Sequence, residues 1–241
     1  MTVLVYYEAV FGLHVTSNMN TGIAGYRTGP MMAAVDDFEL KVIGKQTHGS
    51  RPWNGIDPIV TSAQIINSVQ TIVSRRTDVT KAPAVVTFGA IKGGIRNNII
   101  PDDVTMVGTI RNFDMGIRDN IHQQLGHIVN HVAQANEADI EFKINEGYPV
   151  TVNDPELGEK MLPSLKKVFG EPFVVDTGLI TGAEDFSFFA NEVPGFYFFM
   201  GVTPKSQDAK TAASNHSPHF YVDETALLNG VSAFVQLVQD Y

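Results

Sequence analysis

The stretch Phe38-Glu39-Leu40-Lys41-Val42 decides how the middle of the chain folds, because apolar and charged side chains alternate strictly along it. Successive side chains of a β-strand point to opposite faces, so the three apolar residues would enter a core while Glu39 and Lys41 face water. The pattern therefore predicts a strand with one buried face, as found in a sheet that is covered on one side.

Further elements follow this strand in a regular order. Asp57 and Pro58 are typical of a helix start, and apolar residues continue at helical spacing to about Arg75. Beyond this helix the pattern predicts strands at 84–91 and 104–113, a helix at 117–132 and a strand at 140–144. The order βαββαβ predicts a ferredoxin-like split motif.

The two flanks show a different pattern. Residues 10–15 indicate one buried strand, followed by a turn-rich loop to Pro30. After Gly147 we expect a helix from Asp154 to Gly170 and buried strands at 174–176 and 196–200. A last helix would be capped by Asp223 and carry an apolar face made of Leu227, Val231, Phe234 and Val238.

The expected fold class is therefore α/β with an inserted domain. Residues 1–34 and 147–241 would form two pieces of one α/β domain, because their strands are buried on both faces. Residues 35–146 would form the βαββαβ insert.

The amino-acid composition limits the classes of binding partner that we expect. The net charge is −9 and no Lys/Arg cluster stands out, so a nucleic acid or an anionic membrane is an unexpected partner and a small molecule fits better. No apolar stretch approaches the roughly 20 residues of a membrane helix. Nothing near Met1 reads as a secretory signal, which makes the cytoplasm the expected location. Because there is no cysteine, any metal ion must be held by His, Asp or Glu.

Two histidine positions are candidate metal ligands. His14 ends a predicted buried strand, and ligands collect at the carboxyl ends of strands in open α/β sheets. His216 lies in the loop segment NHSPHF (215–220), before the last helix. Each also has a plain structural explanation, as a core histidine or as a surface residue. His127 and His131 are excluded, because their spacing places them opposite the apolar face of their helix.

Other residues are candidates for binding or catalysis. His48 lies in a glycine-flanked loop and could equally be a solvated loop residue. Asn98 precedes a strand that carries Arg111, and an arginine with a nearby amide could bind a carboxylate instead of forming a surface ion pair. Gly182 and Glu184 belong to a small-residue turn that could also be a helix N-terminus.

Taken together, these segments resemble one family. The motifs occur in family order: VFGLH (10–14), GPMMAA (29–34), THG (47–49), GIDPI (55–59), GG (93–94), NIIPD (98–102), GTIR (108–111), GYP (147–149), GAEDF (182–186) and HSPHF (216–220). The chain resembles the hippurate hydrolase, N-acyl-amino-acid amidohydrolase and auxin-conjugate hydrolase branch of the aminoacylase/carboxypeptidase metallopeptidases.

The resemblance implies a function and a role for each candidate. It implies an amidohydrolase that cleaves N-acyl amino acids with two divalent ions, zinc or manganese, and a homodimer formed through the insert, which serves as a lid. His14 and His216 would be metal ligands. His48 would stabilise the oxyanion from the partner subunit, and Asn98 and Arg111 would hold the substrate carboxylate beside the turn of Gly182 and Glu184.

The chain also departs from the family pattern. The family's other ligands, its paired glutamates and its general base belong to an N-terminal segment that has no counterpart here. We therefore expect an incomplete catalytic domain that is inactive alone. Two alternatives stay open: a dimerisation module without chemistry, or a module that binds N-acyl amino acids without cleaving them. We further expect an uncovered sheet edge and apolar face that promote assembly.

Overall fold

The computed structural model describes residues 7–241, which form two compact units of mixed α/β structure. The first unit contains residues 7–32, 151–180 and 184–241, and the second contains 33–150 with 181–183. The expected insert at 35–146 falls within the second unit. No helix in the described part of the chain is long and apolar enough to cross a membrane.

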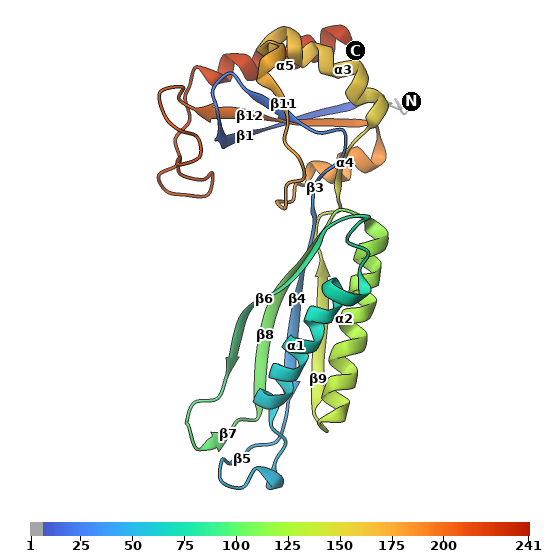
Figure 1. The fold of residues 1–241 in the computed structure, drawn as a ribbon, viewed down its shortest axis with the longest axis vertical. Coiled ribbons are helices and arrows are strands. Elements are labelled where there is room, and N and C mark those ends of the chain that lie inside the picture. Colours follow the sequence, from blue (N-terminus) through green and yellow to red (C-terminus); the bar gives the residue numbers. More distant parts are fainter. Residues whose placement is uncertain (1–6) are drawn as a thin grey trace, which may run out of the picture. The chain divides into compact units, whose positions relative to one another are not determined.

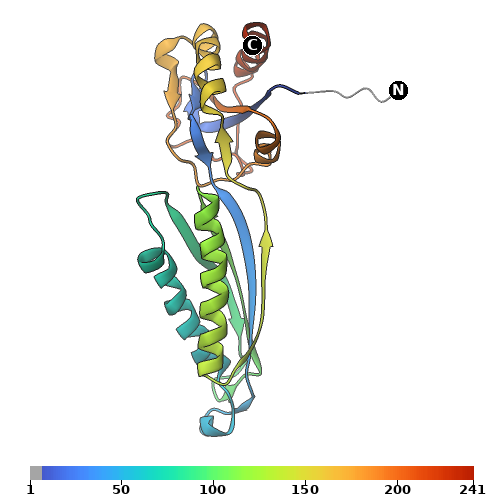
Figure 2. The same ribbon diagram turned by 90° about the vertical axis from the view of Figure 1, so that its right-hand side faces the viewer.

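The second unit is a four-stranded antiparallel sheet with two helices on one face (Figures 1 and 2). Its elements are β4 (Ala34–Ile43), α1 (Pro58–Arg76), β6 (Ala84–Gly93), β8 (Asp103–Asn112), α2 (Met115–Ala135) and β9 (Asp139–Glu146), with the short strands β5 (Thr47–His48) and β7 (Ile99–Ile100). The sheet order is β6-β8-β4-β9. The predicted succession βαββαβ is thus present, and β4 begins four residues before Phe38.

The alternation in β4 has the expected result. Phe38, Leu40 and Val42 are at most 1% exposed and pack with α1 and α2, whereas Glu39 is exposed and Lys41 is half-buried. Asp57 caps α1 by accepting hydrogen bonds from the amides of Ile59 and Val60, as predicted from the sequence.

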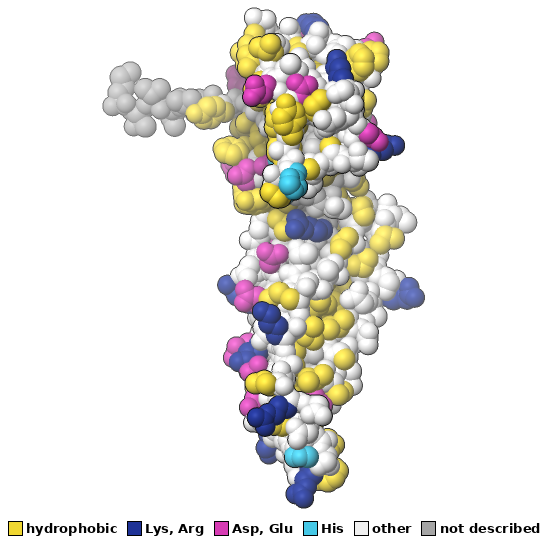
Figure 3. All heavy atoms as spheres, turned by 90° about the vertical axis from the view of Figure 1, so that its left-hand side faces the viewer, with side chains coloured by type: hydrophobic (Ala, Val, Ile, Leu, Met, Phe, Trp, Pro, Cys, Tyr) yellow, Lys and Arg dark blue, Asp and Glu magenta, His cyan; other side chains and the backbone are white. Residues whose placement is uncertain are grey.

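On the face shown in Figure 3, hydrophobic side chains lie among charges of both signs, without a patch of one sign.

A buried ionic cluster joins β4 and β9, which are the first and last long strands of this unit along the chain. Asp36 on β4 is fully buried and accepts hydrogen bonds from Arg118, from His122 (2.7 Å) and from the Gly147 amide (3.1 Å). Burial alone would raise the pKa of Asp36, but these donors outweigh it and lower the pKa. Because Gly147 follows β9, the cluster fastens the end of β9 to the start of β4.

The first unit is a mixed sheet with the order β1-β12-β2-β11 and a small antiparallel pair, β10-β3. The strands are β1 (Val10–Asn20), β2 (Ala24–Tyr26), β3 (Gly29–Met32), β10 (Thr151–Asn153), β11 (Val174–Asp176) and β12 (Gly195–Thr203). The helices are α3 (Pro155–Phe169), α4 (Phe186–Glu192) and α5 (Ala226–Asp240). Every residue of β12 is buried. Its alternate side chains pack with α3 and α5 or with α4. These helices lie on opposite faces of the sheet (Figure 1).

The turn-rich reading of residues 18–30 was wrong. β1 continues to Asn20, and β2 and β3 follow; the strands are separated only by short connections at 21–23, where Gly22 has a φ of +93°, and at 27–28. Asn20 is tolerated at the strand end because its side-chain amide donates to the carbonyls of Pro204 (3.0 Å) and Gln207 (2.8 Å).

Two further predictions need correction. β11 is not buried, because Val175 and Asp176 are exposed at the sheet edge. α5 begins at Ala226, and Asp223 does not cap it; the Asp223 carboxylate instead accepts hydrogen bonds from the amide and hydroxyl of Thr225.

The apolar face predicted for α5 is exposed. Its buried face consists of Ala226, Gly230, Ala233 and Leu237. A Cβ at Gly230 would lie 3.3 Å from side-chain atoms of Leu13 and Met200, so small residues let this helix approach the sheet closely. The exposed stripe is made of Leu227, Leu228, Val231, Phe234, Val235 and Val238.

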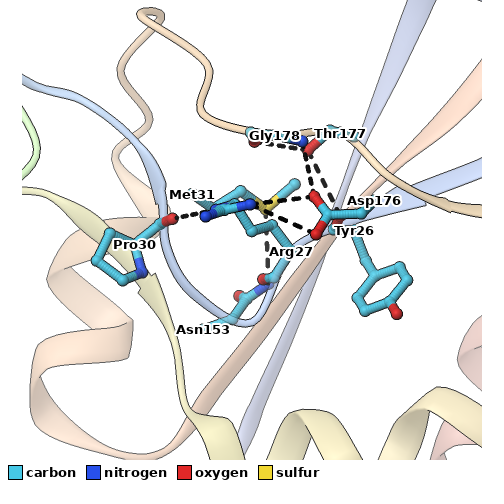
Figure 4. A network of polar contacts seen from close by, with 8 residues as sticks. All are labelled: Tyr26, Arg27, Pro30, Met31, Asn153, Asp176, Thr177 and Gly178. Atoms are coloured by element: carbon cyan, nitrogen blue, oxygen red, sulfur yellow. Dashed lines mark hydrogen bonds and ion pairs between the residues drawn. The ribbon is translucent and has the colours of Figure 1, made fainter. Parts of the chain in front are cut away.

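Polar contacts hold together the strands that lead out of and back into this unit (Figure 4). Arg27 donates to the Asp176 carboxylate and to the Pro30 carbonyl, which links the β2–β3 turn to β11. Asn153 on β10 is fully buried and donates to the carbonyls of Arg27 (2.8 Å) and Tyr197 (2.7 Å). These contacts fix β3 and β10 against β12.

Candidate functional site

The candidate residues fall in both units. His14, Glu184 and His216 belong to the first unit, and His48, Asn98, Arg111 and Gly182 belong to the second.

His14 lies within β1 rather than at its end. β1 runs parallel to β12, with His14 opposite Phe199, and their regular register ends at Thr16 before it shifts. His14 is therefore two residues from the carboxyl end of the regular ladder, and its ring contacts that of Phe199 at 5.7 Å between centroids. Its Nδ1 lies 2.6 Å from the carbonyl oxygen of Val15. Because a carbonyl can only accept, Nδ1 carries the hydrogen and Nε2 carries the lone pair that a metal ion needs.

His216 lies in an exposed loop that is attached to the same part of β1. Its neighbour Asn215 donates to the Val15 carbonyl at 2.7 Å and accepts from the Ser17 amide at 3.1 Å. The structure thereby brings the loop of His216 to the strand of His14 across about 200 positions of sequence. Asn215 belongs to the loop motif NHSPHF (215–220), and no role was predicted for it from the sequence.

The described residues do not complete a metal site. Within residues 7–241, no group of three or more His, Cys, Asp or Glu side chains lies close enough to hold a metal ion. The donor chemistry of His14 and His216 suits two ligand positions. A dinuclear site needs more, because catalytic zinc ions usually take three protein ligands each or share a bridging carboxylate.

Glu184 is held by a tyrosine that the sequence analysis missed. The Tyr197 hydroxyl donates to Glu184 Oε2 at 2.6 Å, and the Asp185 amide donates to Oε1 at 3.1 Å. Tyr197 is 3% exposed, and its burial, followed by its hydrogen bond to Glu184, raises its pKa. Asp185, at the start of α4, makes no capping hydrogen bond with its side chain. Glu184 does lie at the N-terminus of α4, as in the alternative explanation, because its carbonyl accepts from the amide (3.2 Å) and the hydroxyl (2.7 Å) of Ser187. The Tyr197 contact is additional to this structural role.

Tyr197 also connects Glu184 to the surroundings of His14. Tyr197 and Phe199 lie two residues apart on β12, and their rings meet edge to face with centroids 5.8 Å apart. Phe199 in turn contacts His14. Glu184 and His14 are thus linked through one buried strand.

His48 and Asn98 lie together at one end of the second unit. β5 pairs with β7 so that His48 is opposite Ile99, and the Gly49 amide donates to the Asn98 carbonyl at 2.7 Å. The Ser50 amide donates to His48 Nδ1 at 3.1 Å. Since Nδ1 accepts, the neutral His48 ring carries its hydrogen on Nε2, where it can be donated to a negatively charged oxygen.

Arg111 lies at the other end of the second unit, on β8 of the four-stranded sheet. It pairs with Val35 and Val85, and Gly182 is close by because its carbonyl accepts from the Ala33 amide at 3.0 Å. Arg111 lies eight positions along β8 from Asp103, which corresponds to roughly 26 Å of strand. Asn98 and Arg111 therefore do not lie side by side in one chain, contrary to the reading of Asn98 as a nearby amide.

His127 and His131 lie on the exposed face of α2, as expected. Their rings are 4.1 Å apart, and His131 Nδ1 donates to the His127 carbonyl.

Comparison with known proteins places this chain in a family. The model of peptidase family M20/M25/M40 matches residues 5–240, and the chain belongs to this family. Thermostable carboxypeptidase 2 of Saccharolobus solfataricus is 39% identical over 231 residues, which cover 95% of this chain and 57% of the relative. The N-acetyl-L-cysteine deacetylase of Bacillus subtilis is 35% identical over 221 residues, covering 92% of this chain and 51% of the relative.

A solved structure agrees with this assignment. A Bacillus subtilis protein described as a dinuclear metal binding peptidase of the M20 family matches with a TM-score of 0.72 and 28% identity. The match covers 95% of this chain and 56% of that one. The chain thus spans little more than half the length of these relatives. The predicted metallopeptidase family is confirmed, with carboxypeptidase and deacetylase relatives, whereas a hippurate hydrolase in particular is not.

Proposed function

We propose that this chain forms the C-terminal part of a metal-dependent amidohydrolase that cleaves the amide bond of N-acyl amino acids. The attachment of the His14 strand and the His216 loop to one carbonyl oxygen carries the proposal. It brings two imidazole ligands from distant parts of the sequence to one region, in a chain whose relatives include a deacetylase of an N-acylated amino acid.

Two divalent ions, zinc or manganese, would occupy the complete site. His14 and His216 would supply one ligand each, and the remaining ligands and the general base would come from residues outside this chain. When bound, the ions would polarise the amide carbonyl and lower the pKa of a water molecule. We therefore propose that this chain alone is inactive.

The second unit would act as a ferredoxin-like lid and dimerisation domain. Arg111, near Gly182, would bind the substrate carboxylate, for which a guanidinium offers paired donors. Since His48 and Asn98 lie at the far end of the second unit from Arg111, they would complete the pocket of a partner subunit, where His48 Nε2 would donate to the developing oxyanion. Glu184, held by Tyr197, would line the pocket on the first unit. The cytoplasm remains the expected location.

A second candidate function is a module that binds N-acyl amino acids, or only dimerises, without chemistry. Within residues 7–241 there is no group of three potential metal ligands, which favours this alternative for the chain as it stands.

A chimera separates these functions. The part of the Saccharolobus carboxypeptidase that precedes its matched region would be joined to this chain, and release of the free amino acid from benzoylglycine and acetylated amino acids would be measured. We expect turnover that is lost in His216→Ala and a raised KM in Arg111→Met. A folded, metal-loaded chimera without turnover on any N-acyl amino acid would contradict the proposal.

A further inference from the structure

Asn215 closes the free edge of β1 just after His14. Among the described residues β1 has one neighbouring strand, β12, and their regular register ends at Thr16. On a sheet edge, backbone N–H and C=O groups lack partners from a neighbouring strand. The Asn215 side chain supplies both partners, since Nδ2 donates to the Val15 carbonyl and Oδ1 accepts from the Ser17 amide.

The spacing of these bonds resembles that of a neighbouring strand. In a parallel ladder, the N–H and C=O of one residue bond to a carbonyl and an amide that lie two residues apart on the next strand, as those of Val15 and Ser17 do. The Ser17 hydroxyl lies 3.4 Å from the same Oδ1, and the Ser17 carbonyl accepts from Thr203 at 2.6 Å. Ser17 is 1% exposed, so its polar groups depend on these protein partners.

The same contact fixes both candidate ligands. His14 Nδ1 and Asn215 Nδ2 donate to one oxygen, at 2.6 and 2.7 Å. This oxygen sets the tautomer of His14, and it holds the residue directly before His216, whose Cα is about 3.8 Å from that of Asn215. The loop has a further internal bond from the Ser217 amide to the Ser214 carbonyl, at 2.8 Å.

We propose that Asn215 is a positioning residue for metal binding: through the Val15 carbonyl and the Ser17 amide it holds His216 at a fixed place relative to His14. This inference rests on the proposed function, because it takes His14 and His216 as ligands. It adds a residue that touches neither metal nor substrate but sets the geometry of both imidazoles.

The test follows the histidine rings of the full chain by NMR, with and without Zn²⁺. In the wild type we expect His14 with its hydrogen on Nδ1, and ring signals of His14 and His216 that respond to Zn²⁺ at one common midpoint. In Asn215→Ala that midpoint should rise about 10- to 100-fold, as for other residues that orient metal ligands, or split into two. Asn130→Ala, on the exposed face of α2, is the matched control and should leave it unchanged.

A purely structural role gives a different result. If Asn215→Ala speeds hydrogen exchange of the Ser17 amide but leaves the common Zn²⁺ midpoint unchanged, Asn215 only closes the strand edge and the proposal is wrong. Should Asn215→Ala fail to fold, Asn215→Asp takes its place, because it keeps an acceptor for Ser17 but cannot donate to Val15. The same rise of the midpoint is expected, and an unchanged midpoint overturns the proposal.

A metal-free measurement separates this inference from the proposed function. Backbone order at His216, measured by heteronuclear relaxation, should be high in the wild type and fall in Asn215→Ala. If it falls while neither ring of the wild type responds to Zn²⁺, the positioning role stands and metal binding by these histidines fails. If the backbone order at His216 does not fall in Asn215→Ala, the positioning role is overturned, whether or not the histidine rings respond to Zn²⁺.

Discussion

His14 and Asn215 donate hydrogen bonds to the same atom, the carbonyl oxygen of Val15, at 2.6 and 2.7 Å. One donor lies next to Val15 in the sequence, and the other is 200 residues away. This shared acceptor connects the two candidate ligands, and the first prediction depends on it.

Removing either ligand should weaken metal binding at this place. We expect His14→Ala and His216→Ala each to lower Zn²⁺ affinity by at least about 10-fold, measured by competition with a coloured chelator. His219→Ala is the control, since His219 is exposed in the same loop and should leave affinity unchanged. Equal affinity in all three variants would mean that these histidines do not bind the metal.

Acid should destabilise the second unit through Asp36. Its pKa is lowered in the folded state, so the unfolded state binds the proton more tightly. The stabilisation is therefore present above the unfolded pKa of about 3.9 and is lost as pH falls through the lower folded value. Urea titrations between pH 7 and pH 2 should show this loss.

Substitution of the partner of Asp36 gives a sharper test. Arg118→Met leaves a buried carboxylate without its guanidinium and should cost about 3–5 kcal/mol at pH 7. Asp119→Asn, at the adjacent exposed position, should cost almost nothing. A similar loss in both variants would show that the cluster does not stabilise the fold.

Tyr197 should resist ionisation. Burial and the nearby Glu184 raise its pKa, so its stabilisation is present below the unfolded pKa of about 10 and is lost as pH rises toward the folded value. Ultraviolet titration should show that one of the seven tyrosines ionises only when the chain unfolds.

Tyr197→Phe removes only the hydroxyl and keeps the ring packing, so the ionisation that accompanies unfolding should be absent from the titration of this variant. If the wild type already titrates completely below the unfolding transition, the contact between Tyr197 and Glu184 is absent in solution.

The exposed stripe of α5 should promote self-association. Val231 and Val238 are 63% and 72% exposed, and an apolar patch of this kind is typical of a surface that another element covers. Val231→Glu with Val238→Glu should reduce association in sedimentation velocity without lowering stability. Ala233→Glu, on the buried face, should destabilise the chain. Unchanged association in the double variant would exclude this stripe as the contact.

The second unit was predictable because its sheet has one covered face. Alternation in β4 and helical spacing in α1 and α2 report burial directly. The rule that the apolar face of a helix is its buried face failed for α5. The apolar stripe of α5 faces outward because small residues, among them Gly230, occupy its close contact with the sheet.

The candidate site was predictable only in part, because its defining contacts are long-range. Asparagine is typical of turns, but Asn20 ends a strand here, because its side-chain amide donates to the carbonyls of Pro204 and Gln207. Asn215 and Tyr197 are ordinary residues by local pattern, and their roles depend on Val15, Ser17 and Glu184, which lie far from them or on other elements.

Under the proposed function, this chain would carry two metal ligands and the substrate-binding residues of an amidohydrolase but not a complete catalytic centre. The most direct measurement combines metal content with release of glycine from benzoylglycine by the purified chain, supplied with Zn²⁺ or Mn²⁺. We expect substoichiometric, weakly held metal and no turnover. Two tightly bound ions per chain together with turnover that His216→Ala abolishes would contradict it.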